Sequence, residues 1–128
     1  MTTDSASPTA SVLVVERSTA IQRLFEVVLR DVADRVFLVA EPQEARELLA
    51  TESIDLVILE PQGSYELQWE LLEHLATSAI PAVVVTSRVD ERVEQEAIQR
   101  GATAFVAKPF LPEALQAIVR DLVRTHST

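Results

Sequence analysis

The chain has 128 residues, of which 48% are hydrophobic and 24% are charged, and its formal net charge is −9. This length and composition are typical of one globular domain, whereas the acidic balance argues against nucleic acid or an anionic membrane surface as a partner. The lack of cysteine excludes disulfides and thiolate metal sites, and no apolar stretch is long enough to span a bilayer, so we expect a cytoplasmic protein.

Short apolar runs alternate along the chain with longer amphipathic stretches. Residues 1–10 are small and polar and are predicted to form a loose tail, without the basic and apolar regions of a signal peptide. The valine-rich run 12–15 predicts a first strand, and Ser18 can cap the helix whose apolar residues repeat to about Arg30. Further strands, each followed by a helical pattern, are predicted at 36–40, 54–59, 82–85 and 104–107.

Proline and glycine mark several helix ends. Pro42 and Pro112 suit the first turns of the second and fifth helices, and Gly101 can end the fourth helix in the left-handed conformation. Strands that are apolar on both faces, each followed by an amphipathic helix, indicate a parallel sheet covered on both sides. The predicted fold class is therefore α/β, with one domain over 11–124 and a short C-terminal tail at 125–128.

Polar side chains follow four of the five predicted strands. In open α/β sheets, ligands bind beyond the carboxyl ends of the strands. Any single polar residue at a strand end is adequately explained by contact with water, but an ordered set of acids, bases and hydroxyls is not. The residues of this set are Glu16, Arg17, Glu60, Thr86, Ser87 and Lys108.

Four segments of the sequence resemble the receiver domains of bacterial response regulators, the phosphoacceptor proteins of two-component systems. They are 12–16 (VLVVE), 55–60 (DLVILE), 81–87 (PAVVVTS) and 101–110 (GATAFVAKPF). The resemblance runs from about Ser11 to Arg124, and the last segment is its most specific part. It implies a flavodoxin-like sheet of strand order 2-1-3-4-5.

In such receivers, an aspartate after the third strand accepts a phosphoryl group from a histidine kinase and binds Mg²⁺ together with an acid pair after the first strand. A hydroxyl and a lysine contact the phosphoryl oxygens, which suits the charge that develops there. By this resemblance, Thr86 and Lys108 match those two groups, and Phe105 matches the aromatic residue that reports switching. Lys108–Pro109 matches a peptide bond that is usually cis in the family.

Two positions of this predicted pocket depart from the family. Glu60 stands where the acceptor aspartate belongs, and Glu16 with Arg17 stands where the acid pair belongs. Mg²⁺ requires oxygen ligands, and a guanidinium offers none, so we expect Mg²⁺ binding to be lost or weak, with no metal, cofactor or catalytic residue. We expect Arg17 and Lys108 to neutralise Glu16 and Glu60. Glu60 then either mimics a phosphorylated aspartate or belongs to an inactive pocket closed by ion pairs.

The predicted function is a phosphorylation-independent pseudo-receiver, not an enzyme, that signals by binding a protein. A histidine kinase, an output protein and a second copy of the chain are the candidate partners. Charge pairs on one face could support such contacts, supplied by Arg92, Arg100, Arg120, Asp121 and Arg124. The alternative is a working phosphorelay receiver that uses Glu60 or another acid with Mg²⁺. Asp55 is a poor substitute acceptor because it begins the third strand, and an unrelated enzyme is disfavoured because two glycines cannot form a glycine-rich phosphate loop.

Overall fold

The computed structural model describes residues 10–61, 65–87 and 91–126. The strands lie at Ser11–Val15 (β1), Arg35–Val39 (β2), Leu56–Leu59 (β3), Ala82–Thr86 (β4) and Ala104–Ala107 (β5). The helices lie at Thr19–Leu29 (α1), Pro42–Thr51 (α2), Tyr65–Thr77 (α3), Glu91–Gln99 (α4) and Pro112–His126 (α5). None of these helices is long and apolar enough to cross a membrane.

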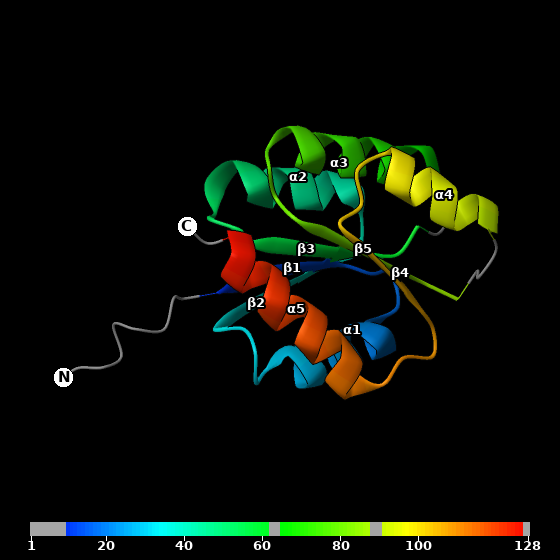
Figure 1. Cartoon of the computed structure of the whole chain (residues 1–128). Helices are drawn as coiled ribbons and strands as arrows, with labels where there is room; N and C mark the ends of the chain where they lie inside the picture. The colour runs from blue at the N-terminus through cyan, green and yellow to red at the C-terminus, as the bar shows by residue number, and fades with distance from the viewer. Residues whose placement is uncertain (1–9, 62–64, 88–90, 127–128) are drawn as a thin grey trace.

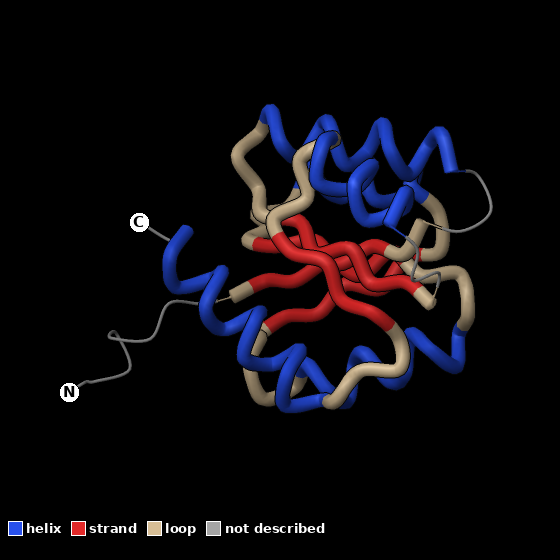
Figure 2. The backbone as a smooth tube through the Cα atoms, turned by 45° about the vertical axis from the view of Figure 1, so that its right-hand side comes forward, coloured by secondary structure: helices blue, strands red, loops and turns tan. Residues whose placement is uncertain are grey.

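The five strands form one parallel sheet in the order β2-β1-β3-β4-β5, which confirms the predicted topology (Figures 1 and 2). Successive parallel strands require a crossover connection, and helices α1 to α4 each lie within one. Helices α1 and α5 cover one face, and α2, α3 and α4 cover the other (Figure 1). Because every strand runs in the same direction, all five carboxyl ends meet at one edge of the sheet.

Each face of the sheet has its own apolar core, since alternate side chains of a strand point to opposite faces. In β1, Val12 and Val14 join the core beneath α1 and α5, whereas Leu13 and Val15 join the core beneath α2, α3 and α4. All four side chains are fully buried. This explains why β1 reads as a continuous apolar run rather than as an alternating one.

Local signals set the helix boundaries. The Ser18 hydroxyl accepts a hydrogen bond from the Ile21 N–H at 3.2 Å and caps α1. Gly101 has φ of +109°, and the bond from Ala102 N to Ala97 O closes α4 in front of β5.

The ends of the domain differ by a few residues from the expected ones. Ala10, expected in the tail, is buried and donates its N–H to Asp34 Oδ2 at 2.7 Å. Helix α5 continues to His126, and the Thr125 hydroxyl bonds Asp121 O within it. Neither extension could be predicted from the sequence pattern, because the pattern does not show the hydrogen bonds that side chains make at the ends of the domain.

A candidate site where the strands end

Backbone hydrogen bonds between neighbouring strands bring three polar residues to one edge of the sheet. Glu16 N bonds Val39 O at 2.9 Å, Glu60 N lies 3.4 Å from Val15 O, and Lys108 N bonds Thr86 O at 2.9 Å. The residues that directly follow β1, β3 and β5 are therefore fixed by the sheet register, not by flexible loops.

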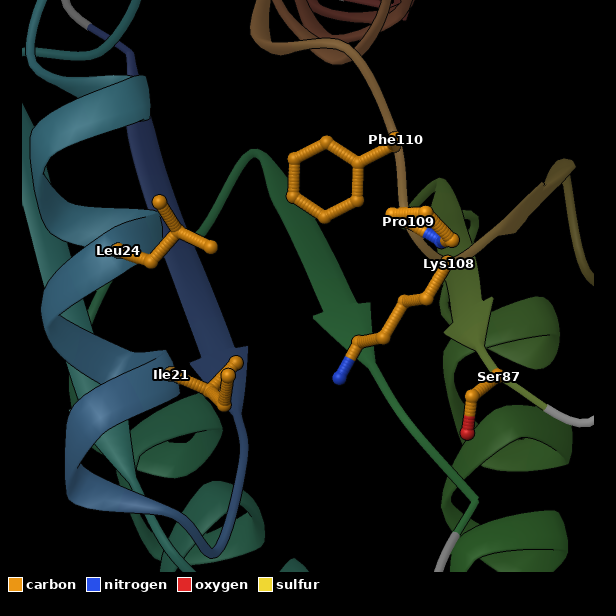
Figure 3. Close-up of a pocket in the computed structure, with 6 residues that line it drawn as sticks. All are labelled: Ile21, Leu24, Ser87, Lys108, Pro109 and Phe110. Carbon is orange, nitrogen blue, oxygen red and sulfur yellow. The ribbon is translucent and has the colours of Figure 1, made fainter.

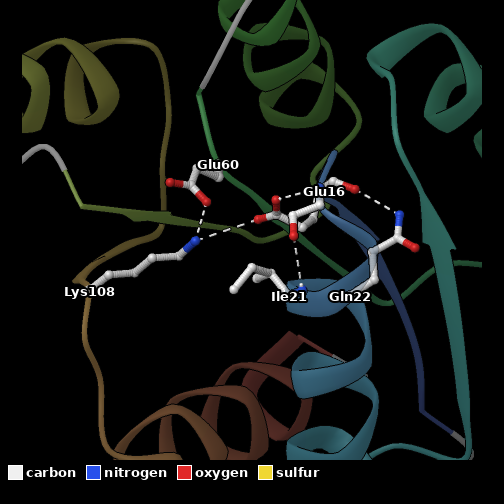
Figure 4. Close-up of polar contacts among 6 residues, drawn as sticks. Glu16, Ile21, Gln22, Glu60 and Lys108 are labelled. Carbon is white, nitrogen blue, oxygen red and sulfur yellow. Dashed lines mark hydrogen bonds and ion pairs between the residues drawn. The ribbon is translucent and has the colours of Figure 1, made fainter.

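Their side chains form a buried ionic cluster of Glu16, Glu60 and Lys108 (Figure 4). The Lys108 ammonium donates a hydrogen bond to Glu60 Oε1, and it lies 3.5 Å from Glu16 Oε1. Only 3% of each glutamate side chain and 18% of the lysine side chain is exposed. Two carboxylates thus share one ammonium in a site almost closed to water, where charge interactions are screened weakly.

The loop that follows β1 holds Glu16 in place. Ser18 N–H donates to Glu16 Oε2 at 2.9 Å, and Gln22 Nε2 donates to the Glu16 carbonyl at 2.7 Å. The other carboxylate oxygen, Glu16 Oε1, is buried and has no hydrogen-bond partner. Its contact with Lys108 is therefore an ion pair without a good hydrogen bond.

The surroundings of Glu60 shift its pKa in two opposing directions. Burial raises the pKa of Glu60 above 4.5, and the neighbouring Glu16 adds to this shift. The hydrogen bond from Lys108 opposes it by stabilising the carboxylate, but burial is the larger effect. A second carboxylate in the same cluster means that one ammonium does not balance both charges.

The structure corrects the expected role of Arg17. Its Nε lies 3.4 Å from Glu41 Oε2 in an exposed pair, with 55% and 49% of the two side chains accessible. Arg17 therefore does not neutralise Glu16 or Glu60, and among the described residues Lys108 is the basic side chain that contacts both. The physical reason is that successive residues leaving a strand point in different directions. Glu16 points into the site, whereas the guanidinium keeps its hydration beside Glu41.

The other predicted residues surround this cluster at different depths. Thr86 is fully buried at the end of β4, and Ser87 is exposed next to it. Phe105 is half-buried and packs against the core under α2, α3 and α4. The Lys108–Pro109 bond is cis, as expected.

The predicted charged face lies elsewhere, and three of its five charged residues are paired within the described part of the domain. Arg100 contacts Glu96 and Glu73, and Arg124 contacts Asp121. Asp55 lies at the opposite edge of the sheet, as predicted, and accepts the Ser11 N–H at 2.8 Å. Its role there is to fix the start of β1.

Sequence reasoning missed a pocket beside the ionic cluster. It has a volume of about 300 Å³ (Figure 3). Its lining residues are Ile21, Leu24, Ser87, Lys108, Pro109 and Phe110. Leu24 is 45% exposed although it belongs to the apolar pattern of α1. The sequence offers no signal for this pocket, because the apolar pattern of α1 predicts that Leu24 is buried.

The ionic cluster of Glu16, Glu60 and Lys108 offers few ligands for a metal ion. No group of three or more histidine, aspartate or glutamate side chains is suitably placed within the described ranges. Glu16 and Glu60 supply oxygens, but the Lys108 ammonium contacts both of them. Mg²⁺ prefers an octahedral shell that usually includes one or two carboxylates and several waters, so a bound ion would have to displace this lysine.

Known proteins resemble this chain both in sequence and in fold. The chain is 34% identical to the KDP operon transcriptional regulatory protein KdpE of Escherichia coli strain K12 over 121 residues, which cover 91% of the chain and 52% of KdpE. It is 30% identical to the regulatory protein VirG of Agrobacterium fabrum over 121 residues, which cover 93% of the chain and 48% of VirG. The chain thus spans about half the length of these relatives.

The fold matches a solved receiver structure over nearly its whole length. A CheY-like response regulator receiver domain protein from Methanospirillum hungatei JF-1 superposes with a TM-score of 0.84 at 20% identity, covering 94% of this chain and 98% of that one. The family model of the response regulator receiver domain matches residues 12–120. The chain therefore belongs to the response regulator receiver domain family, whose members act in signal transduction.

Proposed function

We propose that this domain is a pseudo-receiver, which signals without phosphorylation through contacts with a protein partner. The observation that carries the proposal is the buried ion pairing of Lys108 with Glu60 and Glu16. In a phosphorylated receiver that lysine would contact the phosphoryl group. Here the side chain at the acceptor position already occupies it.

The chemistry of Glu60 supports the same conclusion. A glutamate carboxylate lies about one bond length, roughly 1.5 Å, farther from the backbone than that of aspartate. An error of about 1 Å in the position of a reacting atom can lower a rate about a hundredfold. The Glu60 carboxylate is also held by a hydrogen bond from Lys108 and is only 3% exposed, so a phosphodonor would have little access to it.

The predicted loss of Mg²⁺ rests on the residues that follow β1. One of the two acids of the family pattern is replaced by Arg17, which turns to Glu41. Glu16 is then the single acid after β1, and its carboxylate contacts Lys108 and Ser18 N–H. We infer that this domain has weak Mg²⁺ affinity and that Lys108 supplies the positive charge in the site.

A specific feature favours the alternative, a phosphorelay receiver that uses Glu60 with Mg²⁺. Glu16 Oε1 is buried without a hydrogen-bond donor, and a metal ion would satisfy it. The two functions therefore differ in whether Mg²⁺ displaces Lys108 from the carboxylates.

The deciding experiment is an NMR titration of the whole chain with Mg²⁺, without and with beryllofluoride, a mimic of the phosphoryl group. The pseudo-receiver predicts no saturable shift at the amides of residues 16, 60 and 86 at millimolar Mg²⁺. A saturable response at those amides would overturn the proposal. Incubation with acetyl phosphate, followed by mass spectrometry of the intact protein, gives a second readout, since a phosphorylated species would support the alternative.

The partner is proposed from the relatives. The KdpE and VirG relatives are regulatory proteins about twice as long as this chain. For a receiver domain of this family, the proposed partner is an output protein, a histidine kinase or a second copy of the chain. Sedimentation velocity across a concentration series tests the homodimer directly. A single monomeric species at high micromolar concentration would exclude the second copy and leave a different protein as the partner.

A further inference from the structure

The pocket beside the ionic cluster combines an apolar wall with two polar groups. Ile21 and Leu24 of α1 lie on one side, and Pro109 and Phe110 lie across from them (Figure 3). The Lys108 side chain reaches into the space between these walls, and Ser87 also lines the pocket. The volume of about 300 Å³ is at the lower end of the range for small-molecule sites.

Contacts within the domain anchor one residue on each wall of the pocket. Phe110 stacks on buried Phe25 with ring centroids 5.7 Å apart, which ties the β5–α5 connection to α1. Ile21 is held by the cap from Ser18. Preformed apolar walls with a few convergent polar groups are typical of ligand sites.

Lys108 and Ser87 form the polar end of the pocket, and the charges around Lys108 determine which ligand head groups can bind there. An ammonium has three donor hydrogens, and among the described residues Lys108 contacts two carboxylates, which leaves a donor for the pocket. An anion would be attracted by Lys108 but repelled by Glu16 and Glu60 directly behind it, so its net attraction is small. A cationic ligand would lie next to the Lys108 ammonium and be repelled by it. A charged ligand of either sign would also lose hydration on entering the pocket.

We infer that this pocket binds a small neutral carbonyl compound with a short apolar tail. The carbonyl oxygen accepts hydrogen bonds from the Lys108 ammonium and the Ser87 hydroxyl, and the tail packs against Leu24 and Phe110. This inference rests on the proposed function, because it requires Lys108 to stay paired with the two glutamates. It gives the domain an input other than a phosphoryl group.

Three probes with the same branched tail and different head groups test the inference: isocaproamide, isocaproate and isohexylamine. Each is titrated by NMR into the whole chain without Mg²⁺. We expect saturable shifts from isocaproamide at the amides of residues 21, 87 and 110, at millimolar concentration because a ligand of about eight heavy atoms has little surface to bury. We expect isocaproate and isohexylamine to bind at least about tenfold more weakly, because charged heads lose hydration without gaining net attraction.

A pair of substitutions on α1 provides the matched control. Leu24 lines the pocket, whereas Val27 is outside its lining and is similarly exposed, at 57% against 45%. Leu24→Ala should weaken isocaproamide binding severalfold, Val27→Ala should leave it unchanged, and Ser87→Ala should reduce the preference for the amide over the carboxylate.

Three results would overturn the inference: no saturable shift with isocaproamide, equal effects of Leu24→Ala and Val27→Ala, or tighter binding of either charged probe. A silent amide together with a silent beryllofluoride titration would reject this ligand and leave the pseudo-receiver standing. A positive beryllofluoride titration would reject the pseudo-receiver itself.

Discussion

Lys108 supplies the ammonium that two buried glutamates share, so its removal leaves both carboxylates without that charge. We expect Lys108→Met to lower the free energy of unfolding by about 3 kcal/mol, because an uncompensated buried charge is costly. Urea denaturation at neutral pH measures this. The control is Arg124→Met, which removes one partner of an exposed pair with Asp121 and should leave stability nearly unchanged.

The same cluster predicts a partial rescue. Glu60→Gln in the Lys108→Met background removes one of the two carboxylates that have lost the Lys108 charge, so the double variant should be more stable than Lys108→Met alone. Additive losses from the two substitutions would show that the side chains are not coupled, and the ionic cluster would then not explain the stability of this site.

Glu60 also predicts a pH dependence. Because its pKa is raised in the folded protein, the folded state binds more protons than the unfolded state between pH 4.5 and the raised pKa. This stabilisation is fully present below pH 4.5 and is lost as the pH rises through the folded pKa. The wild type should therefore gain stability relative to Glu60→Gln as the pH falls through this window.

Paired denaturation curves of wild type and Glu60→Gln, measured across the pH series, test this sign. Other titrating groups are common to the two proteins and largely cancel in the difference. A stability difference that stays constant, or that favours the wild type more as pH rises, would contradict the raised pKa.

At the scale of the elements, two turns at the amino-terminal edge of the sheet have positive φ, and they predict opposite effects. Gly101 has φ of +109°, and a Cβ there would lie 2.6 Å from Ala76 Cβ. Gly101→Ala should destabilise the domain by about 1–3 kcal/mol through strain and overlap. Ala79, at φ of +59°, is a non-glycine residue in the same left-handed region.

Ala79→Gly should therefore be neutral or stabilising by up to about 1 kcal/mol, since relief of left-handed strain exceeds the added chain entropy by a small margin. Thermal unfolding of the two single variants beside the wild type measures both signs. If Ala79→Gly destabilised the protein as much as Gly101→Ala did, the backbone conformation would not be the cause.

At the scale of the whole molecule, the sheet has the strand order of a receiver domain, whereas Arg17 and Glu60 differ from the residues expected at their positions. We therefore expect Arg17→Asp combined with Glu60→Asp to bind Mg²⁺ more tightly than the wild type does. Both positions lie at strand ends outside the apolar cores, so the double variant should fold. Shifts at the amides of residues 16, 60 and 86 on Mg²⁺ addition measure the gain.

Glu60→Asp alone is the control for that experiment. It restores the length of the acceptor side chain without the second acid after β1, so its Mg²⁺ response should be much weaker. An equal response from the single and double variants would mean that Arg17 does not limit metal binding. No response from the double variant would mean that features outside these two positions determine it.

The sequence by itself determined the architecture. Five apolar runs separated by amphipathic stretches leave few ways to bury both faces of every strand, and the observed strands begin and end within two residues of those predicted. The register then follows, because parallel strands that share two apolar cores cannot slip by one residue without exposing them. The positions of Glu16, Glu60 and Lys108 at one edge are a direct consequence of that order.

Only the tertiary structure decided how these side chains pair. Sequence reasoning assigned Arg17 to the cluster, but Arg17 and Glu16 leave the strand in different directions. Glu41, the residue before α2, offers Arg17 an exposed partner. The pocket beside Lys108 is also tertiary in origin, since α1 and the β5–α5 connection meet there only in the fold. Periodicity sets which face a residue occupies, whereas side-chain direction and the groups opposite it depend on contacts between distant parts of the chain.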